Sequence, residues 1–183
     1  ITRMLSHVGD TDGDGVIFSR DCAEYTVRTP GGAELVLLVN HFKSQGYGSQ
    51  AESLARRRRQ ARRVSQVYRA LVAEGHTHVA VVGDLNDHPR SPALATLLRR
   101  TDLRDVSTHP SFDDGGHPGT HGDCRATDKL DYLLLSPSLY AHVTAGGYER
   151  RGMWGGKDGR RFERFPQIRR PAHAASDHAA VWA

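Results

Sequence analysis

The chain has 183 residues, which suits one domain with a sizeable core, and its composition, 38% apolar and 25% charged, is typical of a soluble globular protein. No apolar run approaches the roughly 18 residues of a membrane-spanning helix, and the sequence leaves the cell compartment open. The net charge of +4 favours an anionic partner such as nucleic acid or another phosphate ester. Cys22 and Cys124 are too few for a disulfide framework and fit either two buried side chains or one bridge.

The first segment with a distinctive pattern is residues 10–21, DTDGDGVIFSRD. Its aspartates fit the spacing of an EF-hand calcium loop, with Asp21 in place of the final glutamate. An EF-hand needs a helix on each side, and here a strand is expected to follow. We therefore interpret the segment as a solvated loop, with Ca²⁺ binding as the alternative.

A strand is predicted over 18–29 and a second over 34–42, and the short Pro-Gly-Gly turn between them favours an antiparallel hairpin. A helix is predicted over 49–73, because Ser49 and Glu52 can form a capping box and apolar residues recur at helical spacing.

The same helix contains a dense basic run, RRRRQARR, at 56–63. Such a run usually marks a solvated face, and contact with a phosphate backbone is the alternative. Beyond the helix, the pattern predicts strands at 78–84, 129–136 and 179–183, a short helix at 91–100 capped by Ser91, and a long loop at 146–170. Strands and helices therefore alternate along a single domain over 1–183.

Four motifs place polar side chains next to apolar, strand-like runs: NHFKS (40–44), GDLND (83–87), KLDY (129–132) and SDH (176–178). Carboxylate and carbonyl oxygens, the donors of Asp and Asn, are the ligands that Mg²⁺ prefers. Histidines can donate to phosphate oxygens or transfer protons near neutral pH, and a carboxylate can orient one of them. Acyl transfer is less attractive, because the chain has no nucleophile-elbow motif.

In this order and spacing, the four motifs resemble those of the endonuclease/exonuclease/phosphatase superfamily. That superfamily includes deoxyribonuclease I, exonuclease III, inositol-polyphosphate 5-phosphatases and bacterial sphingomyelinases. The resemblance covers almost the whole chain. It implies an α+β fold, the four-layer αββα sandwich of the deoxyribonuclease I-like type, and metal-dependent cleavage of a phosphate ester.

The resemblance also implies a role for each motif residue. His41 contacts the scissile phosphate or its leaving group, while Asp84, as general base, and Asn86 position the attacking water and the phosphate. Asp131 orients His178, which stabilises charge on the pentacovalent phosphate. The implied catalytic residues are therefore His41, Asp84, Asn86, Asp131 and His178, and the implied ligands of a Mg²⁺ or Mn²⁺ ion are Asp177, Asp84 and Asn86.

The 146–170 segment combines aromatic and basic side chains just before SDH, a mixture that suits a nucleic-acid strand or a phosphorylated head group. We expect Lys43, Trp154 and Lys157 to contact the substrate. Together with the basic net charge, this favours a nuclease acting on DNA or RNA. The alternatives are a phosphatase or a phospholipid or inositol-phosphate phosphodiesterase of the same superfamily, and a catalytically incomplete binding module.

The sequence departs from the family in its N-terminal part. Members have a metal-binding Asn and, further on, a metal-binding Glu in a half that precedes the first histidine, whereas only 40 residues precede His41 here. Glu24 and Glu34 lie in the hairpin, where the family's glutamate does not. We therefore expect the C-terminal portion of a longer catalytic domain, lacking part of its N-terminal half. These 183 residues alone are expected to bind metal weakly and to have little activity.

Overall fold

The computed structural model describes residues 1–46 and 48–183. Its strands are β1 (Arg3–Ser6), β2 (Thr11–Asp12), β3 (Gly15–Val16), β4 (Cys22–Arg28), β5 (Glu34–His41), β6 (Val79–Asp84), β7 (Arg104–Asp105), β8 (Phe112–Asp113), β9 (Asp131–Leu135), β10 (Gly146–Glu149) and β11 (Ala180–Trp182). Its α-helices are α1 (Gln50–Ala73), α2 (Ala95–Arg99) and α3 (Pro137–Tyr140). Within the described residues, no helix has the length and apolar character needed to cross a membrane.

Six strands form the main sheet, in the order β1-β4-β5-β6-β9-β7. Strands β5 and β6 are parallel, whereas the other neighbouring pairs are antiparallel. The carboxyl ends of β5 and β6 therefore reach the same edge of the sheet, and β9 begins at that edge. The predicted hairpin is confirmed as β4 and β5, although its first strand begins at Cys22 and not at residue 18.

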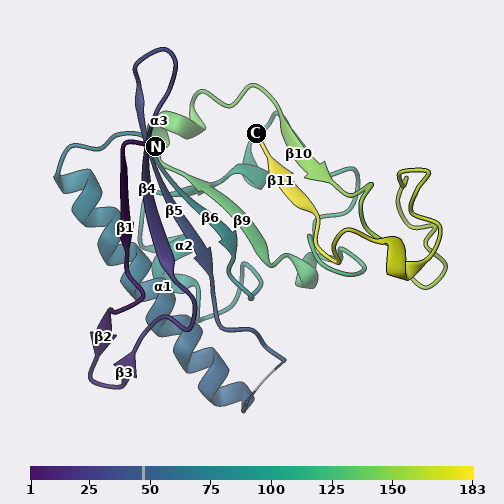
Figure 1. Ribbon diagram of the computed structural model, residues 1–183, viewed down its shortest axis with the longest axis horizontal. Helices are drawn as coiled ribbons and strands as arrows, with labels where there is room; N and C mark the ends of the chain where they lie inside the picture. The colour runs from purple at the N-terminus through teal and green to yellow at the C-terminus, as the bar shows by residue number, and fades with distance from the viewer. Residues whose placement is uncertain (47) are drawn as a thin grey trace.

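Helix α1 covers one face of this sheet, as Figure 1 shows. Ser49 is its N-cap and forms the predicted capping box with Glu52. Every second strand residue faces the helix, because side chains alternate between the two faces of a strand. The resulting core combines Ala61, Val64, Tyr68 and Leu71 of the helix with Val36, Leu38, Val81 and Leu134 of the strands. Burial of these side chains stabilises the fold by about 25 cal/mol per Å² of apolar surface.

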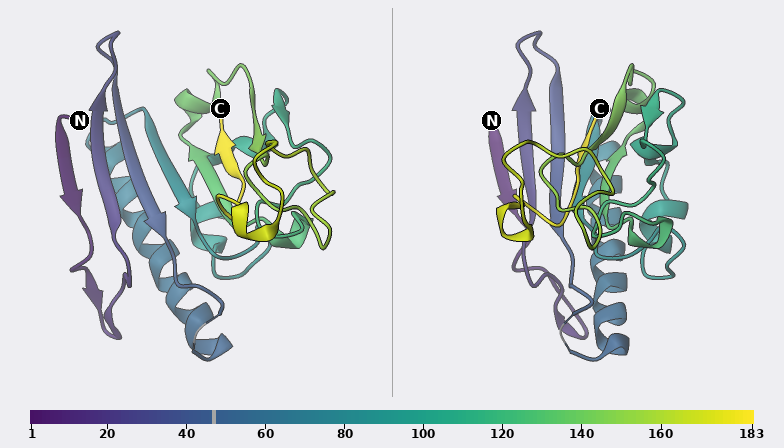
Figure 2. Two further views of the ribbon diagram at one scale, coloured as in Figure 1. Left: turned by 45° about the vertical axis from the view of Figure 1, so that its right-hand side comes forward. Right: turned by 90° about the vertical axis from the view of Figure 1, so that its right-hand side faces the viewer.

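A three-stranded sheet, β11-β10-β8, lies on the other side of the main sheet (Figure 2). Its residues Phe112 and Val181 belong to one apolar cluster with Val82 and Leu133 of the main sheet. The layers therefore follow the order helix, six-stranded sheet, three-stranded sheet, which is a helix-sheet-sheet part of the expected sandwich. Val39 on β5 is 38% exposed, because the three-stranded sheet does not cover this part of the main sheet.

Two predicted elements differ from the structure. The 146–170 segment is not a loop throughout, because β10 occupies its start; the glycines Gly146 and Gly147 disguise this strand, since glycine is depleted in strands. The helix predicted over 91–100 is also too long. Helix α2 begins after Leu94, and the Oγ atom of Ser91 instead accepts a hydrogen bond from the backbone nitrogen of Ala93 at 3.1 Å, within a turn.

The basic run of α1 is a solvated face only in part, since Arg58 and Arg62 are exposed whereas other arginines of the run are not. The Arg57 side chain is only 3% exposed. Arg59 donates from Nε to Asp12 Oδ2 at 2.9 Å, and Arg63 donates from Nε to Asp10 Oδ2 at 2.6 Å. These ion pairs hold the β2–β3 hairpin against the helix. They also occupy guanidinium groups that would otherwise be needed to bind a phosphate backbone. The carboxylates lie far away in the sequence, so a helical pattern alone cannot reveal them.

The same ion pairs show what the aspartates of residues 10–21, which fit the spacing of a calcium loop, do in the structure. The carboxylate of Asp12 accepts hydrogen bonds from Arg59 and Arg62. Its pKa falls to about 2, chiefly because of the hydrogen bond from Arg59. A strand, β4, follows the segment, as expected, and not a helix. The aspartates therefore act as partners of α1, and arginine occupies the oxygens that Ca²⁺ would need.

The two cysteines are both buried and free. Cys22 belongs to the core under α1, and Cys124 belongs to a separate small cluster with Met153 and Ala179. Burial raises the pKa of the Cys22 thiol to about 12. Of the two alternatives, the structure therefore has two buried side chains and no bridge.

Candidate active site

The motif residues converge where β5 and β6 end and β9 begins. In the register of the sheet, His41 is paired with Asp84, and Asp84 is paired with Asp131. Residues at paired positions have neighbouring side chains on one face of a sheet. Three strands therefore bring one imidazole and two carboxylates together from three separate parts of the sequence.

Gly83 allows β6 to deliver Asp84 to this edge. Its φ angle is +124°, and a Cβ atom at this position would lie 1.9 Å from the carbonyl oxygen of Asn40 on β5. No other residue fits this approach of two backbones. The glycine in GDLND is thus a requirement of the strand pairing, and the polar residues follow directly after it.

Asn86 holds Asp84 through two hydrogen bonds. The backbone nitrogen of Asn86 donates to Asp84 Oδ1 at 2.8 Å, and its side-chain Nδ2 donates to Asp84 Oδ2 at 2.9 Å. The same Nδ2 donates to the carbonyl oxygen of Phe42 at 3.1 Å, which leaves the amide oxygen of Asn86 to accept a ligand. The φ angle of Asn86 is +53°, a conformation that asparagine adopts more readily than most residues.

Burial raises the pKa of Asp84 above its usual range. The hydrogen bond from the Asn86 backbone opposes the increase, the charge of Asp131 adds to it, and the nearby histidines again oppose it. One of these, His41, lies with Nε2 3.5 Å from Asp84 Oδ2, and its side chain is 45% exposed. A carboxylate with a raised pKa is a better proton acceptor than an ordinary aspartate, which suits a general base.

Asp131 and His178 form a hydrogen-bonded dyad. The Nδ1 atom of His178 lies 2.8 Å from Asp131 Oδ2, and both side chains are half-buried. The hydrogen bond to Asp131 raises the pKa of His178 above its ordinary value, against the effect of burial. Because Nδ1 is engaged by the carboxylate, the Nε2 atom is the one left for a substrate or a metal ion.

The structure adds His121, a residue that the sequence did not single out. Its ring centroid lies 4.7 Å from that of His178, and its Nε2 lies 3.5 Å from Oδ2 of Asp177. Buried Thr120 holds this segment against the start of β9, since its Oγ1 accepts from the backbone nitrogen of Asp131 at 3.0 Å. No local signal identifies His121, because its partners come from the far end of the chain.

Ligand atoms at this edge form two overlapping groups. Asp84, Asp131 and His178 make up one group, and His121, Asp177 and His178 make up the other. Within each group, one ligand atom per residue lies within 4.8 Å of the others. Asp177 and Asp84, which are both expected to bind the same metal ion, therefore fall in different groups, and His178 belongs to both groups.

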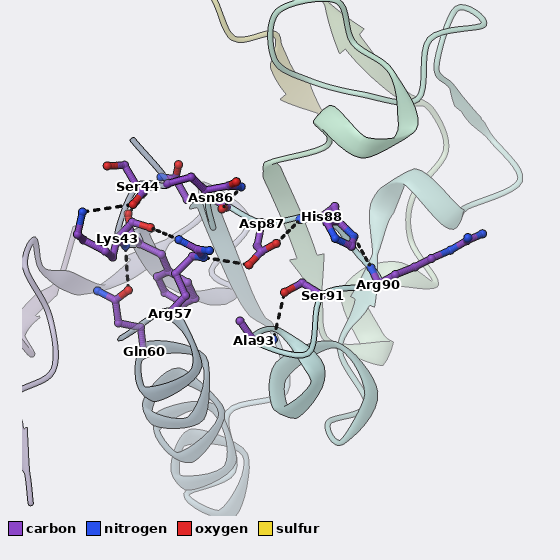
Figure 3. Close-up of polar contacts among 12 residues, drawn as sticks. Lys43, Ser44, Arg57, Gln60, Asn86, Asp87, His88, Arg90, Ser91 and Ala93 are labelled. Carbon is purple, nitrogen blue, oxygen red and sulfur yellow. Dashed lines mark hydrogen bonds and ion pairs between the residues drawn. The ribbon is translucent and has the colours of Figure 1, made fainter. Parts of the chain in front are cut away.

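The loop after β5 is held by α1, as Figure 3 shows. The backbone nitrogen of Lys43 donates to Gln60 Oε1 at 2.9 Å, and Arg57 Nη1 donates to the carbonyl oxygen of Lys43 at 3.1 Å. Arg57 also donates from Nε to Asp87 Oδ2 at 2.9 Å, and both of these side chains are buried. The buried Arg57–Asp87 ion pair therefore joins the NHFKS and GDLND motifs through the helix.

The two other expected substrate contacts lie in the 150–170 segment. Trp154 donates from Nε1 to the carbonyl oxygen of Lys157 at 3.4 Å, and the guanidinium of Arg164 lies 4.4 Å from the centre of a Trp154 ring. A cleft lies at the edge of the sheet where the motif residues converge, and neither Trp154 nor Lys157 lines it. A larger hollow, of about 600 Å³, lies among residues 159–169 and contains none of the four motifs.

The cleft at the strand edge has a volume of about 350 Å³. It is lined by Ser44, Gln45, Gly46, Asn86, His121, Thr127, Asp128, Leu130 and His178. We take this smaller cleft as the candidate active site, because it is lined by Asn86, His121 and His178, and His178 belongs to both ligand groups. Gln45 donates from Nε2 to the carbonyl oxygen of Asn86 at 2.8 Å, which closes one side of the cleft.

The fold and the site together define an α+β domain of the deoxyribonuclease I-like type. The model of the Endonuclease/Exonuclease/phosphatase family matches residues 3–178, and the chain belongs to this family. Members of the family are hydrolases of phosphoesters that generally use divalent metal ions. A comparison with curated protein sequences finds no significant match.

Solved structures of the same family are similar in fold. An endonuclease/exonuclease/phosphatase from Beutenbergia cavernae has a TM-score of 0.61 and 18% identity, over 99% of this chain and 43% of that one. A Bacteroides thetaiotaomicron mannosyl-6-phosphatase has a TM-score of 0.54 and 17% identity, over 65% and 43%. Sphingomyelinase C from Streptomyces griseocarneus has a TM-score of 0.52 and 22% identity, over 70% and 46%. The chain thus spans less than half the length of each of these three structures.

Proposed function

We propose that this chain carries the base and phosphate-binding part of a metal-dependent phosphodiesterase whose substrate is DNA or RNA. The main support is the hydrogen-bonded set of Asp84, Asn86, Asp131 and His178 at one edge of the sheet. The set combines a partly buried carboxylate, whose pKa is raised by burial, with a histidine whose pKa is raised by its hydrogen bond to Asp131. A carboxylate that accepts a proton and a histidine that donates one are the groups that water activation and phosphate stabilisation need.

In this proposal, Asp84 accepts a proton from the attacking water, while Asn86 keeps the carboxylate in place. His178 donates from Nε2 to a phosphate oxygen, because Asp131 holds the opposite side of its ring. His41 donates to the scissile phosphate or its leaving group from the partly exposed side of Asp84. The negative charge that develops on the phosphate is thus met by two imidazoles.

A divalent metal ion fits the donors of this edge. Asp84 offers a carboxylate and Asn86 an amide oxygen, which are ligands that Mg²⁺ and Mn²⁺ accept. A bound ion would supply further neutralisation of charge on the phosphate oxygens. We propose Asp84 and Asn86 as its ligands, and keep Asp177 as an expected ligand whose carboxylate lies beside His121.

A nucleic acid is the preferred substrate class because of the charge of the chain. The net charge is +4, and exposed arginines such as Arg160 and Arg161 follow Lys157 in the segment before SDH. Lys43, Trp154 and Lys157 remain the proposed substrate contacts. The names of the solved relatives leave a phosphomonoester or a sphingolipid as the second candidate, since one is a sugar phosphatase and another a sphingomyelinase.

The test is a substrate panel with Mg²⁺ or Mn²⁺, on this chain and on the longest natural form of the protein. The panel contains plasmid DNA, single-stranded RNA, mannose 6-phosphate and sphingomyelin vesicles. Cleavage of nucleic acid that is lost with Asp84→Asn would support the nuclease. Cleavage of only the sugar phosphate or the lipid would replace it with the second candidate. Binding of nucleic acid without cleavage of any substrate would favour the binding module.

A further inference from the structure

Of the two ligand groups at this edge, we call Asp84, Asp131 and His178 the inner group and His121, Asp177 and His178 the outer group, and the two differ in chemistry. The outer group supplies two imidazole nitrogens and one carboxylate oxygen, whereas the inner group supplies two carboxylates and one imidazole. Imidazole ligands suit Zn²⁺ and similar transition metal ions, whereas Mg²⁺ prefers oxygen alone. The second imidazole of the outer group therefore favours a transition metal ion there over Mg²⁺.

The spacing of the outer group fits one tetrahedral ion. Two ligand atoms at about 2.1 Å from a tetrahedral Zn²⁺ ion lie about 3.4 Å apart. The Nε2 atom of His121 and the Oδ2 atom of Asp177 are 3.5 Å apart. A ring nitrogen of His178 belongs to the same group, in which one ligand atom per residue lies within 4.8 Å of the others.

The backbone around these residues is held by several hydrogen bonds. His121 and His178 form an antiparallel bridge between two segments that are distant in the sequence. The nitrogen of Gly122 donates to the carbonyl oxygen of Asp177 at 3.0 Å, and the nitrogen of Ala179 donates to that of Thr120 at 2.7 Å. The three ligands therefore project from two segments that these backbone hydrogen bonds hold together.

One ligand already has the orienting partner typical of a metal-binding histidine. Such a histidine usually directs its second ring nitrogen to a carboxylate, which fixes the ring and increases its basicity. Asp131 does this for His178, at 2.8 Å from Nδ1. The remaining nitrogen, Nε2, is the one that the proposed hydrolysis uses for the phosphate.

We propose that His121, Asp177 and His178 form a binding site for Zn²⁺ or a similar transition metal ion, separate from the oxygen-rich Mg²⁺ site. Because the proposed hydrolysis uses His178 to bind the phosphate, Zn²⁺ in the outer site removes that imidazole from the phosphate and inhibits hydrolysis. The inhibition rests on the proposed function, whereas the binding of the ion does not. His121 is the residue that distinguishes the outer site, since it belongs to no motif of the inner one.

The test uses Co²⁺ as a spectroscopic probe and Zn²⁺ in calorimetry, on the unmodified chain and two variants. We expect one Co²⁺ per chain with the visible absorption of tetrahedral coordination, displaced by Zn²⁺ and not by excess Mg²⁺. His121→Ala and Asp177→Asn should each weaken binding at least about 10-fold, as expected for the loss of one ligand. His142→Ala is the control, because the exposed His142 side chain hydrogen-bonds, in the described contacts, only to the carbonyl oxygen of Ser138.

The outcomes separate the two proposals. Absence of Co²⁺ binding by the unmodified chain, or equal binding by folded His121→Ala, would overturn the outer site. Bound Zn²⁺ that leaves hydrolysis unchanged would overturn the shared use of His178. If no substrate is cleaved at all, the hydrolase proposal fails, while His121-dependent Co²⁺ absorption still supports the site.

Discussion

The Nδ1 atom of His178 lies 2.8 Å from Oδ2 of Asp131, although 47 residues separate the two in the sequence. Asp131 begins β9, which lies between β6 and the edge strand β7 of the main sheet, and His178 precedes β11 of the small sheet. Their hydrogen bond therefore joins the two sheets at the candidate active site. It also gives the histidine its raised pKa, with Asp131 as the largest cause.

Replacing Asp131 with Asn should lower the pKa of His178 toward the ordinary histidine value, because the carboxylate that stabilises the imidazolium is removed. The raised pKa contributes stability fully below the unfolded-state pKa of about 6.5, and this contribution is lost as the pH rises through the folded-state pKa. The Asn variant should therefore lose stability at acidic pH and little at alkaline pH. NMR titration of His178 and urea unfolding at several pH values measure both effects. An unchanged His178 titration would contradict the dyad.

Replacing Asp84 with Asn should reduce kcat of the proposed hydrolysis at least about 10²-fold, since general bases contribute 10²- to 10⁴-fold. In the unmodified protein, the acid limb of the pH–rate profile should lie above the ordinary aspartate pKa, because burial raises the pKa of Asp84. Glu34→Gln serves as the control, since Glu34 lies at the start of β5 and bonds to His76. An acid limb at the ordinary aspartate pKa would argue against Asp84 as the base.

Replacing Arg57 with Ala should destabilise the fold by about 3–5 kcal/mol, because Asp87 would be left as a buried, unpaired charge. The loop at Lys43 would also lose the donor to its carbonyl oxygen. Arg58→Ala is the matched control, because the neighbouring Arg58 is exposed, and its effect should stay within about 0.5 kcal/mol. Urea unfolding of both variants makes the comparison. Equal effects would mean that the Arg57–Asp87 ion pair contributes nothing specific.

Replacing Gly83 with Ala should destabilise the fold by at least about 2 kcal/mol and disturb the approach of β6 to β5. The added Cβ atom would collide with the carbonyl oxygen of Asn40, and the φ angle of +124° disfavours any residue other than glycine. Gly13→Ala is the control, because nothing lies within 4 Å of a Cβ atom there. Thermal unfolding of the two variants checks the difference. A tolerated Gly83→Ala would contradict this account of the strand end.

Elements whose signals are local follow from the sequence alone. The capping box of Ser49 and Glu52, the hairpin and the β-branched strand that leads to Gly83 all depend on residues within a few positions of each other. The four motifs at the ends of strands also follow from the sequence. Parallel pairing of β5 and β6 then brings two of these motifs to one edge, because strands that run in the same direction end on the same side.

Only the tertiary structure decided the features that depend on partners far away in the chain. The arginines of α1 look like a solvated face until the hairpin with Asp10 and Asp12 lies against them. Strand β10 is hidden by its glycines until β11 and β8 pair with it. His121 has no signal of its own until the bridge to His178 brings the two rings together. The physical reason is that these contacts join segments whose spacing in the sequence is arbitrary, so their energies appear only when the chain has folded.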